Sequence, residues 1–184
     1  AEVSKNDIEK TVSLCGWVQR RRDLGSLIFI WLRDRTGIVQ LVFDQTANKE
    51  CYNVAESVRS EFVLSVKGKV SLRDQHNINP DLKTGEVEVL VENIEILNAS
   101  LTTPFEVNDK NVGTQTRLKY RYLDLRGTAL QDTLMMKHKL SSAFRDFLNN
   151  QGFIDIETPI LTKSTPEGAR DYLVPSRVQH GKFY

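Results

Sequence analysis

Two aromatic side chains and one amide interrupt the most apolar part of the sequence, and they are the residues best suited to bind a flat ligand. Phe29 and Trp31 alternate with aliphatic residues, and Gln40 stands alone between two aliphatic neighbours. A lone amide in an apolar strand lowers stability when it is buried without hydrogen-bond partners. Exposed aromatic rings offer faces on which nucleic-acid bases stack. The aromatic pair therefore predicts either core packing or a binding face, and Gln40 favours the binding face.

The residue types that most often bind metals or attack substrates are few. Cys15 and Cys51 have neither metal-ligand spacing nor partners for a disulfide framework, so we expect both to be core thiols. His76, His138 and His180 have no Cys, Asp or Glu at metal-ligand spacing, so we expect them on the surface. The sequence therefore predicts no metal site.

The first hundred residues must position Gln40 and the aromatic pair, and their pattern predicts a small β barrel. Apolar runs bounded by turn residues predict strands over residues 11–22, 27–32, 37–43, 62–72 and 86–97. Apolar residues three and four apart predict a helix over 46–59, with Thr46 as its N-cap. Three strands, a helix and two strands, in that order, are typical of an OB-fold. This is a five-stranded Greek-key barrel whose face binds single-stranded nucleic acid or sugars.

A part of different character follows a boundary at residues 98–104, where turn residues interrupt the pattern. Basic residues alternate with Leu and Tyr over 116–126, and a long helix is expected over 128–150, ended by Gly152. Residues 153–159 are expected to form a strand that ends in proline. One helix and a strand cannot form a closed core alone, and we therefore expect an α/β domain that continues beyond the last residue. The alternative is that the helix packs on the barrel.

Composition excludes several classes of protein. The 184 residues are 40% hydrophobic and 27% charged, which argues against disorder and collagen-like repeats. No apolar run approaches the roughly 20 residues that span a bilayer, and the polar, acidic N-terminus is unlike a secretory signal. A net charge of +1 ordinarily disfavours nucleic-acid binding, so any such contact has to be local and shape-specific. We expect a cytoplasmic protein with no membrane partner.

Several segments resemble the class II aminoacyl-tRNA synthetases. A long helix followed by a strand ending in proline, at 128–159, resembles motif 1 of that class. An OB-fold before motif 1 is similar to the subclass that charges aspartate, asparagine and lysine. The segments most similar to its bacterial-type aspartyl members are Leu14-Cys-Gly-Trp-Val18, Arg20-Arg-Arg-Asp-Leu-Gly-Ser26, 117–126 and 165–177. Asparaginyl and lysyl relatives differ at Thr165-Pro-Glu-Gly-Ala169.

The resemblance implies a domain organisation and an activity. It implies an OB-fold anticodon-binding domain over residues 1–100, a hinge over 101–127, and over 128–184 the beginning of an antiparallel α/β catalytic domain. Such enzymes attach L-aspartate to tRNA-Asp through aspartyl-adenylate, with ATP and Mg²⁺, as homodimers. The sequence lacks motifs 2 and 3, so we expect an N-terminal fragment that is inactive alone and binds no cofactor. The alternatives are a non-enzymatic OB-fold protein that binds single-stranded nucleic acid, and a lysyl or asparaginyl relative.

By the same resemblance, the barrel reads the anticodon. Phe29 would stack on a base, Gln40 would hydrogen-bond the central uridine, and Glu88 would accept a hydrogen bond from the amine of cytosine in third place. Further residues implied to hold phosphates or splayed bases are Arg22, Arg59, Arg73, Asn77 and Asn79.

Other positions acquire roles from the resemblance. Glu167 resembles the glutamate of a flipping loop that contacts the ammonium group of the aspartate substrate. The dimer interface typical of motif 1 would include Pro159, Leu140 and Phe144. Leu24 resembles members that charge only tRNA-Asp, since relaxed members tend to carry histidine there. Trp31 is a departure, because the family commonly has an acidic residue at this position, and it alters the surface beside Phe29.

Overall fold

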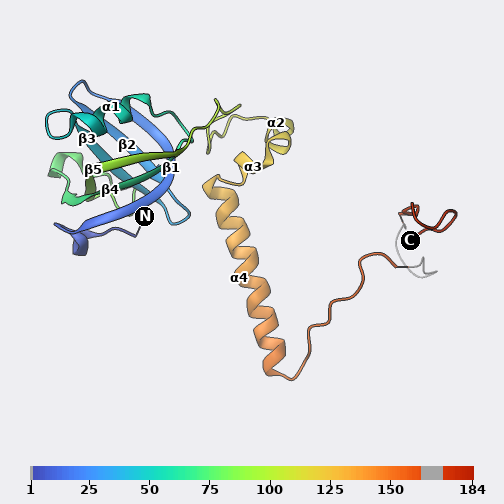
Figure 1. Ribbon diagram of the computed structural model, residues 1–184. Helices are drawn as coiled ribbons and strands as arrows, with labels where there is room; N and C mark the ends of the chain where they lie inside the picture. The colour runs from blue at the N-terminus through green and yellow to red at the C-terminus, as the bar shows by residue number, and fades with distance from the viewer. Residues whose placement is uncertain (1, 163–171) are drawn as a thin grey trace. The chain divides into compact units, whose positions relative to one another are not determined.

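A computed structural model describes residues 2–162 and 172–184, and it divides into two compact units. The first unit, Ala1–Thr128, contains the barrel, three α-helices and two short 3-10 helices, η1 (Lys5–Asp7) and η2 (Gln75–Asn77). The second unit, Ala129–Tyr184, contains most of the long helix α4 (Thr128–Asn150) (Figure 1).

Five strands close into a barrel in the first unit. They are β1 (Thr11–Asp23), β2 (Leu27–Arg33), β3 (Ile38–Asp44), β4 (Val63–Leu72) and β5 (Val87–Asn98). The order around the barrel is β1-β2-β3-β5-β4, and all neighbours are antiparallel except β3 and β5. With α1 (Lys49–Ser57) between β3 and β4, this topology confirms the predicted OB-fold.

Strand β2 shows how the barrel separates its core from its outer face. Ile28, Ile30 and Leu32 are buried in the core, whereas Phe29 and Trp31 lie between them and are half-buried. Successive side chains of a strand point to opposite faces of the sheet, so the two aromatic residues share the outer face. The parity that the sequence leaves open is therefore decided in favour of an aromatic outer surface.

The helix after β3 is shorter than predicted. It spans Lys49–Ser57 rather than 46–59, and its N-cap is Asn48, whose Oδ1 accepts a hydrogen bond from the backbone N–H of Cys51 at 3.0 Å. The prediction of Thr46 as N-cap was wrong. The hydroxyl of Thr46 donates to Asp44 Oδ1 at 2.6 Å, because these residues form a turn at the end of β3.

The segment after β5 belongs to the first unit and contacts the barrel through Arg126. It contains α2 (Thr114–Lys119) and α3 (Arg121–Asp124). Arg126, just beyond α3, donates to Oε2 of the buried Glu61 at 2.8 Å, and its guanidinium carbon lies 5.2 Å from the centre of the Trp17 ring. The predicted hinge segment is therefore attached to the barrel by an ion pair and a cation–π contact.

In the second unit, α4 spans the predicted residues, Thr128–Asn150, and Gly152 follows it with φ +84°, as a helix-ending glycine does. No residue of α4 is buried; Leu140 and Phe144 are exposed, as is Pro159. The strand predicted over 153–159 is absent, so that prediction was wrong. An extended segment becomes a strand only when a neighbour accepts its backbone hydrogen bonds, and the described residues provide none there.

Candidate nucleic-acid interface

The outer face of the barrel carries a hollow of about 640 Å³, which we call the barrel-face hollow. This volume lies within the range of about 300–1,000 Å³ that is usual for ligand sites. The hollow contains every residue expected to read the anticodon except Arg59. Its lining is formed by Arg20, Arg22, Leu24, Leu27, Phe29, Trp31, Gln40, Val42, Ser71, Leu72, Arg73, Asp74, Asn77, Asn79 and Glu88.

Strand register brings the central polar residues together. Trp31 of β2 lies directly opposite Gln40 of β3. On the other side of β3, Leu41 pairs with Val89, which places Glu88 of β5 beside Gln40. Trp31, Gln40 and Glu88 therefore form one row across three strands, although the last two are far apart in the sequence.

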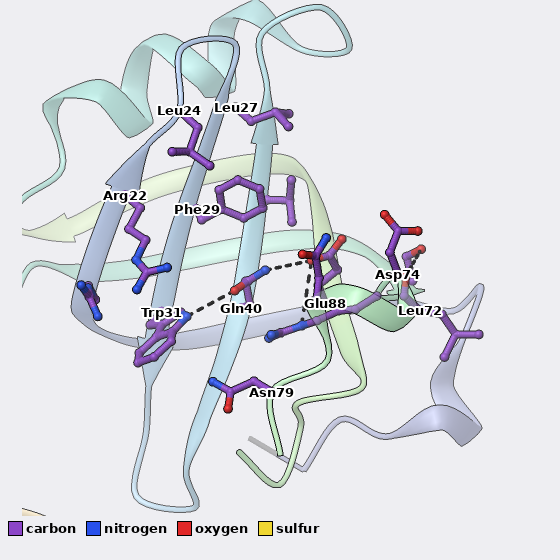
Figure 2. A pocket seen from close by; sticks show the side chains of 15 residues that line it. Arg22, Leu24, Leu27, Phe29, Trp31, Gln40, Leu72, Asp74, Asn79 and Glu88 are labelled. Carbon is purple, nitrogen blue, oxygen red and sulfur yellow. Dashed lines mark hydrogen bonds and ion pairs between the residues drawn. The ribbon is translucent and has the colours of Figure 1, made fainter. Parts of the chain in front are cut away.

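Hydrogen bonds join this row, and Figure 2 shows Gln40 between its two neighbours. The indole Nε1–H of Trp31 donates to Gln40 Oε1 at 3.3 Å. Gln40 Nε2 in turn donates to Glu88 Oε2 at 2.9 Å. The lone amide thus has partners on both sides, which removes the penalty of burying it unpaired. Gln40 is held as part of a polar array on the outer face.

The carboxylate of Glu88 and the guanidinium of Arg73 lie beside Gln40. Burial raises the pKa of Glu88, an effect opposed by the hydrogen bond from Gln40 and by the charge of Arg73. Burial also lowers the pKa of Arg73. Arg73 Nε donates to the carbonyl of Val87 at 3.0 Å and lies 4.0 Å from Glu88 Oε2, and within the described residues its Nη2 has no hydrogen-bond partner. The hollow thus holds a carboxylate acceptor and a spare guanidinium donor.

The aromatic and basic residues of the hollow offer stacking surfaces. The guanidinium carbon of Arg20 lies 5.8 Å from the centre of the Trp31 ring. Phe29 is half-buried beside it, and Leu24, in the turn between β1 and β2, is 68% exposed at the rim. Gly25 forms that turn with φ +82°. Flat bases stack on such rings with about 1–3 kcal/mol each, so the hollow suits unstacked nucleotides.

Arg59 lies in a second hollow of about 670 Å³, separate from the other expected residues. Arg21 and Arg33 line this hollow too, and Arg20 and Trp31 line both. The Arg59 guanidinium donates to the carbonyls of Glu56 and Val58 at 2.8 and 3.0 Å. The two hollows therefore meet at Arg20 and Trp31, and the second provides a basic extension of the first.

The remaining expectations for reactive residues are only partly met. Cys51 is buried as predicted, but Cys15 is exposed, because its side chain lies on the outward side of β1. All three histidines are on the surface as predicted. Glu167 lies outside the described residues. Among those that are described, no group of His, Cys, Asp and Glu has the arrangement of a metal site, and no helix is long and apolar enough to cross a membrane.

Two charged residues that line the barrel-face hollow, Arg20 and Asp74, were not among the predicted site residues. Trp31 was noted as a departure, without its contact to Gln40. Alternation along β2 places Trp31 on the outer face, whereas Arg20 lies opposite Trp31 only because the register of β1 shifts between Val18 and Arg20; strict alternation would put Arg20 on the side of the buried Val18. The pairing of Trp31 with Gln40 also depends on a register that short sequence patterns do not reveal.

Comparison with known families agrees with this geometry. Residues 12–97 match the OB-fold nucleic acid binding domain. Residues 113–184 match the class II tRNA synthetases for D, K and N, the one-letter codes of aspartate, lysine and asparagine. The chain belongs to the class II tRNA synthetases.

This synthetase chain is also similar to individual curated proteins along its whole length. It is 57% identical over 184 residues to an aspartate–tRNA(Asp/Asn) ligase of Geobacillus sp. (strain WCH70), covering 100% of the chain and 31% of the relative. It is 57% identical to an aspartate–tRNA ligase of Staphylococcus epidermidis, covering 99% of the chain and 31% of the relative. The chain therefore spans about a third of the length of these relatives.

Solved structures of synthetases share the architecture. Asparaginyl-tRNA synthetase from Pyrococcus horikoshii, complexed with asparaginyl-adenylate, matches with a TM-score of 0.82 and 28% identity, over 96% of this chain and 40% of that one. Aspartyl tRNA synthetase from Entamoeba histolytica matches with a TM-score of 0.77 and 23% identity, over 85% of this chain and 38% of that one, which supports the fold alone.

Proposed function

We propose that this synthetase chain binds the anticodon of tRNA-Asp through the barrel-face hollow, as part of a longer aspartate–tRNA ligase. The observation that carries the proposal is the joined row of Trp31, Gln40 and Glu88, whose amide and carboxylate are held in place on an aromatic outer face. Base-reading proteins of this kind combine aromatic stacking with hydrogen bonds to the edges of splayed bases.

Each central residue has chemistry that fits one base. Phe29 offers its ring for stacking. The Gln40 amide has an N–H and an oxygen lone pair to spare, which suit the adjacent acceptor and donor of the central uracil. The Glu88 carboxylate accepts from the exocyclic amine of cytosine in third place. The remaining residues are proposed to hold the phosphates or splayed bases of the RNA. They are Arg22, Arg73, Asn77 and Asn79, with Arg59 in the adjoining hollow.

The chemistry of the longer protein is also a proposal. In its reaction the aspartate carboxylate attacks the α-phosphate of ATP and pyrophosphate leaves; a hydroxyl of the terminal adenosine of the tRNA then takes the aspartyl group from the adenylate, and AMP leaves. The described residues contain no cluster that fits Mg²⁺, so no step is assigned to them. Glu167 is proposed to contact aspartate, and the exposed apolar stripe of α4 with Pro159 to form a homodimer interface. The longer protein is expected in the cytoplasm.

Binding of RNA stem-loops to the purified chain tests the anticodon proposal. Fluorescence anisotropy would compare the tRNA-Asp anticodon stem-loop with a loop whose central uridine is replaced. We expect a preference for uridine, and Gln40→Ala should reduce it by about 1–3 kcal/mol because a bidentate contact is lost. Gln45→Ala, an exposed amide at the end of β3 outside the hollow, is the matched control and should leave binding unchanged.

The same assay separates the rival functions. A non-enzymatic protein that binds single strands without sequence preference would bind both loops equally and ignore Gln40→Ala. A lysyl or asparaginyl relative would prefer a different anticodon. As a further check, the chain alone should show no ATP–pyrophosphate exchange, because it spans about a third of its relatives. Measurable exchange would contradict the inference that most of the catalytic apparatus lies elsewhere.

Position 24 tests whether tRNA-Asn is also accepted. An aspartate–tRNA(Asp/Asn) ligase and an aspartate–tRNA ligase both match this chain at 57% identity, so overall identity does not separate the two specificities. We propose that Leu24, at the exposed rim of the hollow that also contains Glu88, restricts binding to tRNA-Asp. Leu24→His should then raise the affinity for a loop with uridine in third place. If Leu24→His leaves the ratio of affinities for loops with uridine and with cytosine in third place unchanged, Leu24 does not determine this specificity.

A further inference from the structure

We propose that Trp31 is a positioning residue for base specificity: its indole N–H fixes the orientation of the Gln40 amide, and that orientation makes the hollow prefer uracil to cytosine in the central position. This inference rests on the proposed function, since it assumes that Gln40 contacts the central base.

The two neighbours of Gln40 permit one orientation of its amide. An indole N–H only donates, so it faces Oε1 of Gln40, at 3.3 Å. An ionised carboxylate only accepts, so Glu88 faces Nε2, at 2.9 Å. Turning the amide by half a rotation would bring two donors together on one side and two acceptors on the other. Both contacts therefore select the same arrangement (Figure 2).

A fixed amide can tell uracil from cytosine, and a freely turning amide cannot. After the contacts to Trp31 and Glu88, Gln40 retains one N–H and one oxygen lone pair. Uracil presents an acceptor at O4 and a donor at N3, whereas cytosine presents a donor at N4 and an acceptor at N3. The two edges carry the same groups in reversed order, so an amide that turns over becomes complementary to cytosine. The orientation of Gln40 is thus the information that separates these bases.

Trp31 is better suited to this task than Glu88. The proposal gives Glu88 a second role at the third base, and burial raises the pKa of its carboxyl, so its contact weakens on acidification. The indole N–H does not titrate and has no acceptor form. Its ring is held directly opposite Gln40 by strand register and lies under the Arg20 guanidinium, 5.8 Å from the ring centre. An acidic side chain here would not hold Oε1 in this way, since an ionised carboxylate donates no hydrogen bond.

The test compares two RNA stem-loops that differ only in uridine or cytosine at the central position, bound to wild type and to Trp31→Phe. Phenylalanine keeps an aromatic ring and removes the donor. We expect the uridine-to-cytosine affinity ratio to fall about two- to tenfold, the range of a single lost hydrogen bond. Trp17→Phe, the other tryptophan of the chain, should leave the ratio unchanged. In a Gln40→Ala background, Trp31→Phe should not change it further.

An unchanged ratio in a folded Trp31→Phe variant would overturn the proposal. Equal weakening of both loops would also overturn it, since Trp31 would then act as a stacking surface. If Trp31→Phe does not fold, an isosteric tryptophan analogue with sulfur in place of the indole N–H, introduced in a Trp17→Phe background, gives the same comparison. A wild-type chain that binds both loops equally would instead refute the anticodon proposal itself.

Discussion

Replacing Glu61 by glutamine should destabilise the barrel more than any surface change of the same chemistry. The Glu61 side chain is 4% exposed, and its Oε2 accepts from Arg33 Nη2 and Arg126 Nη1, each at 2.8 Å. Arg33 is 7% exposed, and within the described residues its Nη1 already has no hydrogen-bond partner. Removing the carboxylate charge leaves the Arg33 cation buried without compensation.

The magnitude follows from how unequally the two arginines are buried. Breaking a buried ion pair by removing one partner costs about 3–5 kcal/mol. Arg126 is 35% exposed and regains water, so its share is small. Glutamine keeps one hydrogen bond to Arg33 and the same left-handed backbone, φ +63° at position 61, so strain is unchanged. We therefore expect a loss of about 3 kcal/mol, a large part of a typical stability of about 5–15 kcal/mol.

Urea unfolding followed by far-UV circular dichroism measures this loss. Glu56→Gln is the matched control, because Glu56 is exposed on α1, and it should change stability by no more than about 0.5 kcal/mol. Glu61→Met combined with Arg33→Met should recover much of the stability, since an apolar pair leaves no buried charge. A loss below about 1 kcal/mol for Glu61→Gln, with an unchanged urea slope, would refute the reasoning that Arg33 depends on this carboxylate.

Three other predictions follow from particular contacts. Gly68→Ala should cost about 1–3 kcal/mol in urea unfolding, because a Cβ would lie 2.3 Å from the Leu90 carbonyl oxygen, whereas Gly113→Ala meets nothing within 4 Å and should be nearly neutral. In the native chain a thiol reagent should label exposed Cys15 alone, since Cys51 is buried and burial raises its pKa; equal labelling rates would contradict this. Burial raises the pKa of Glu88, because the folded barrel disfavours the charged carboxylate. The free chain should therefore become more stable as the pH falls through the raised pKa and the carboxyl is protonated. Affinity for a loop with cytosine in third place should nevertheless fall on acidification as the carboxylate is lost, and at a higher pH than for an ordinary glutamate because the pKa is raised. Glu88→Gln should abolish this dependence, and its persistence would assign it to another group.

The architecture of the barrel could be predicted from the sequence because it depends on local periodicity. Each strand end lies within one residue of the prediction, and the position of α1 between β3 and β4 identifies the topology. The ends of α1 were less predictable, because Asp44 competes for the Thr46 hydroxyl and Asn48 becomes the cap. The strand over 153–159 failed for a different reason, since a strand requires a partner that local sequence does not provide.

Seven of the eight residues expected to read the anticodon line one hollow, but the geometry within that hollow was not predictable. Phe29, Gln40 and Glu88 were named from motifs, and the structure brings them into one hollow. The contact of Trp31 with Gln40 depends on the register of the hairpin formed by β2 and β3. The contact of Gln40 with Glu88 depends on pairing between β3 and β5, which are separated in the sequence by a helix and a strand. Such long-range register is set by the packing of the whole barrel, which no short window of sequence contains.

Several basic side chains of the first unit are paired with carboxylates within the fold, so they are not available to bind phosphates. Glu61 pairs with Arg33 and Arg126, and Asp124 pairs with two arginines of the segment after β5. The Arg20 guanidinium lies over the Trp31 ring, at the place where the two hollows meet. A chain with a net charge of +1 has little general attraction for phosphates, so the proposed RNA binding must take its specificity from contacts to bases. The fixed amide of Gln40 is the group in the hollow best arranged to supply such a contact.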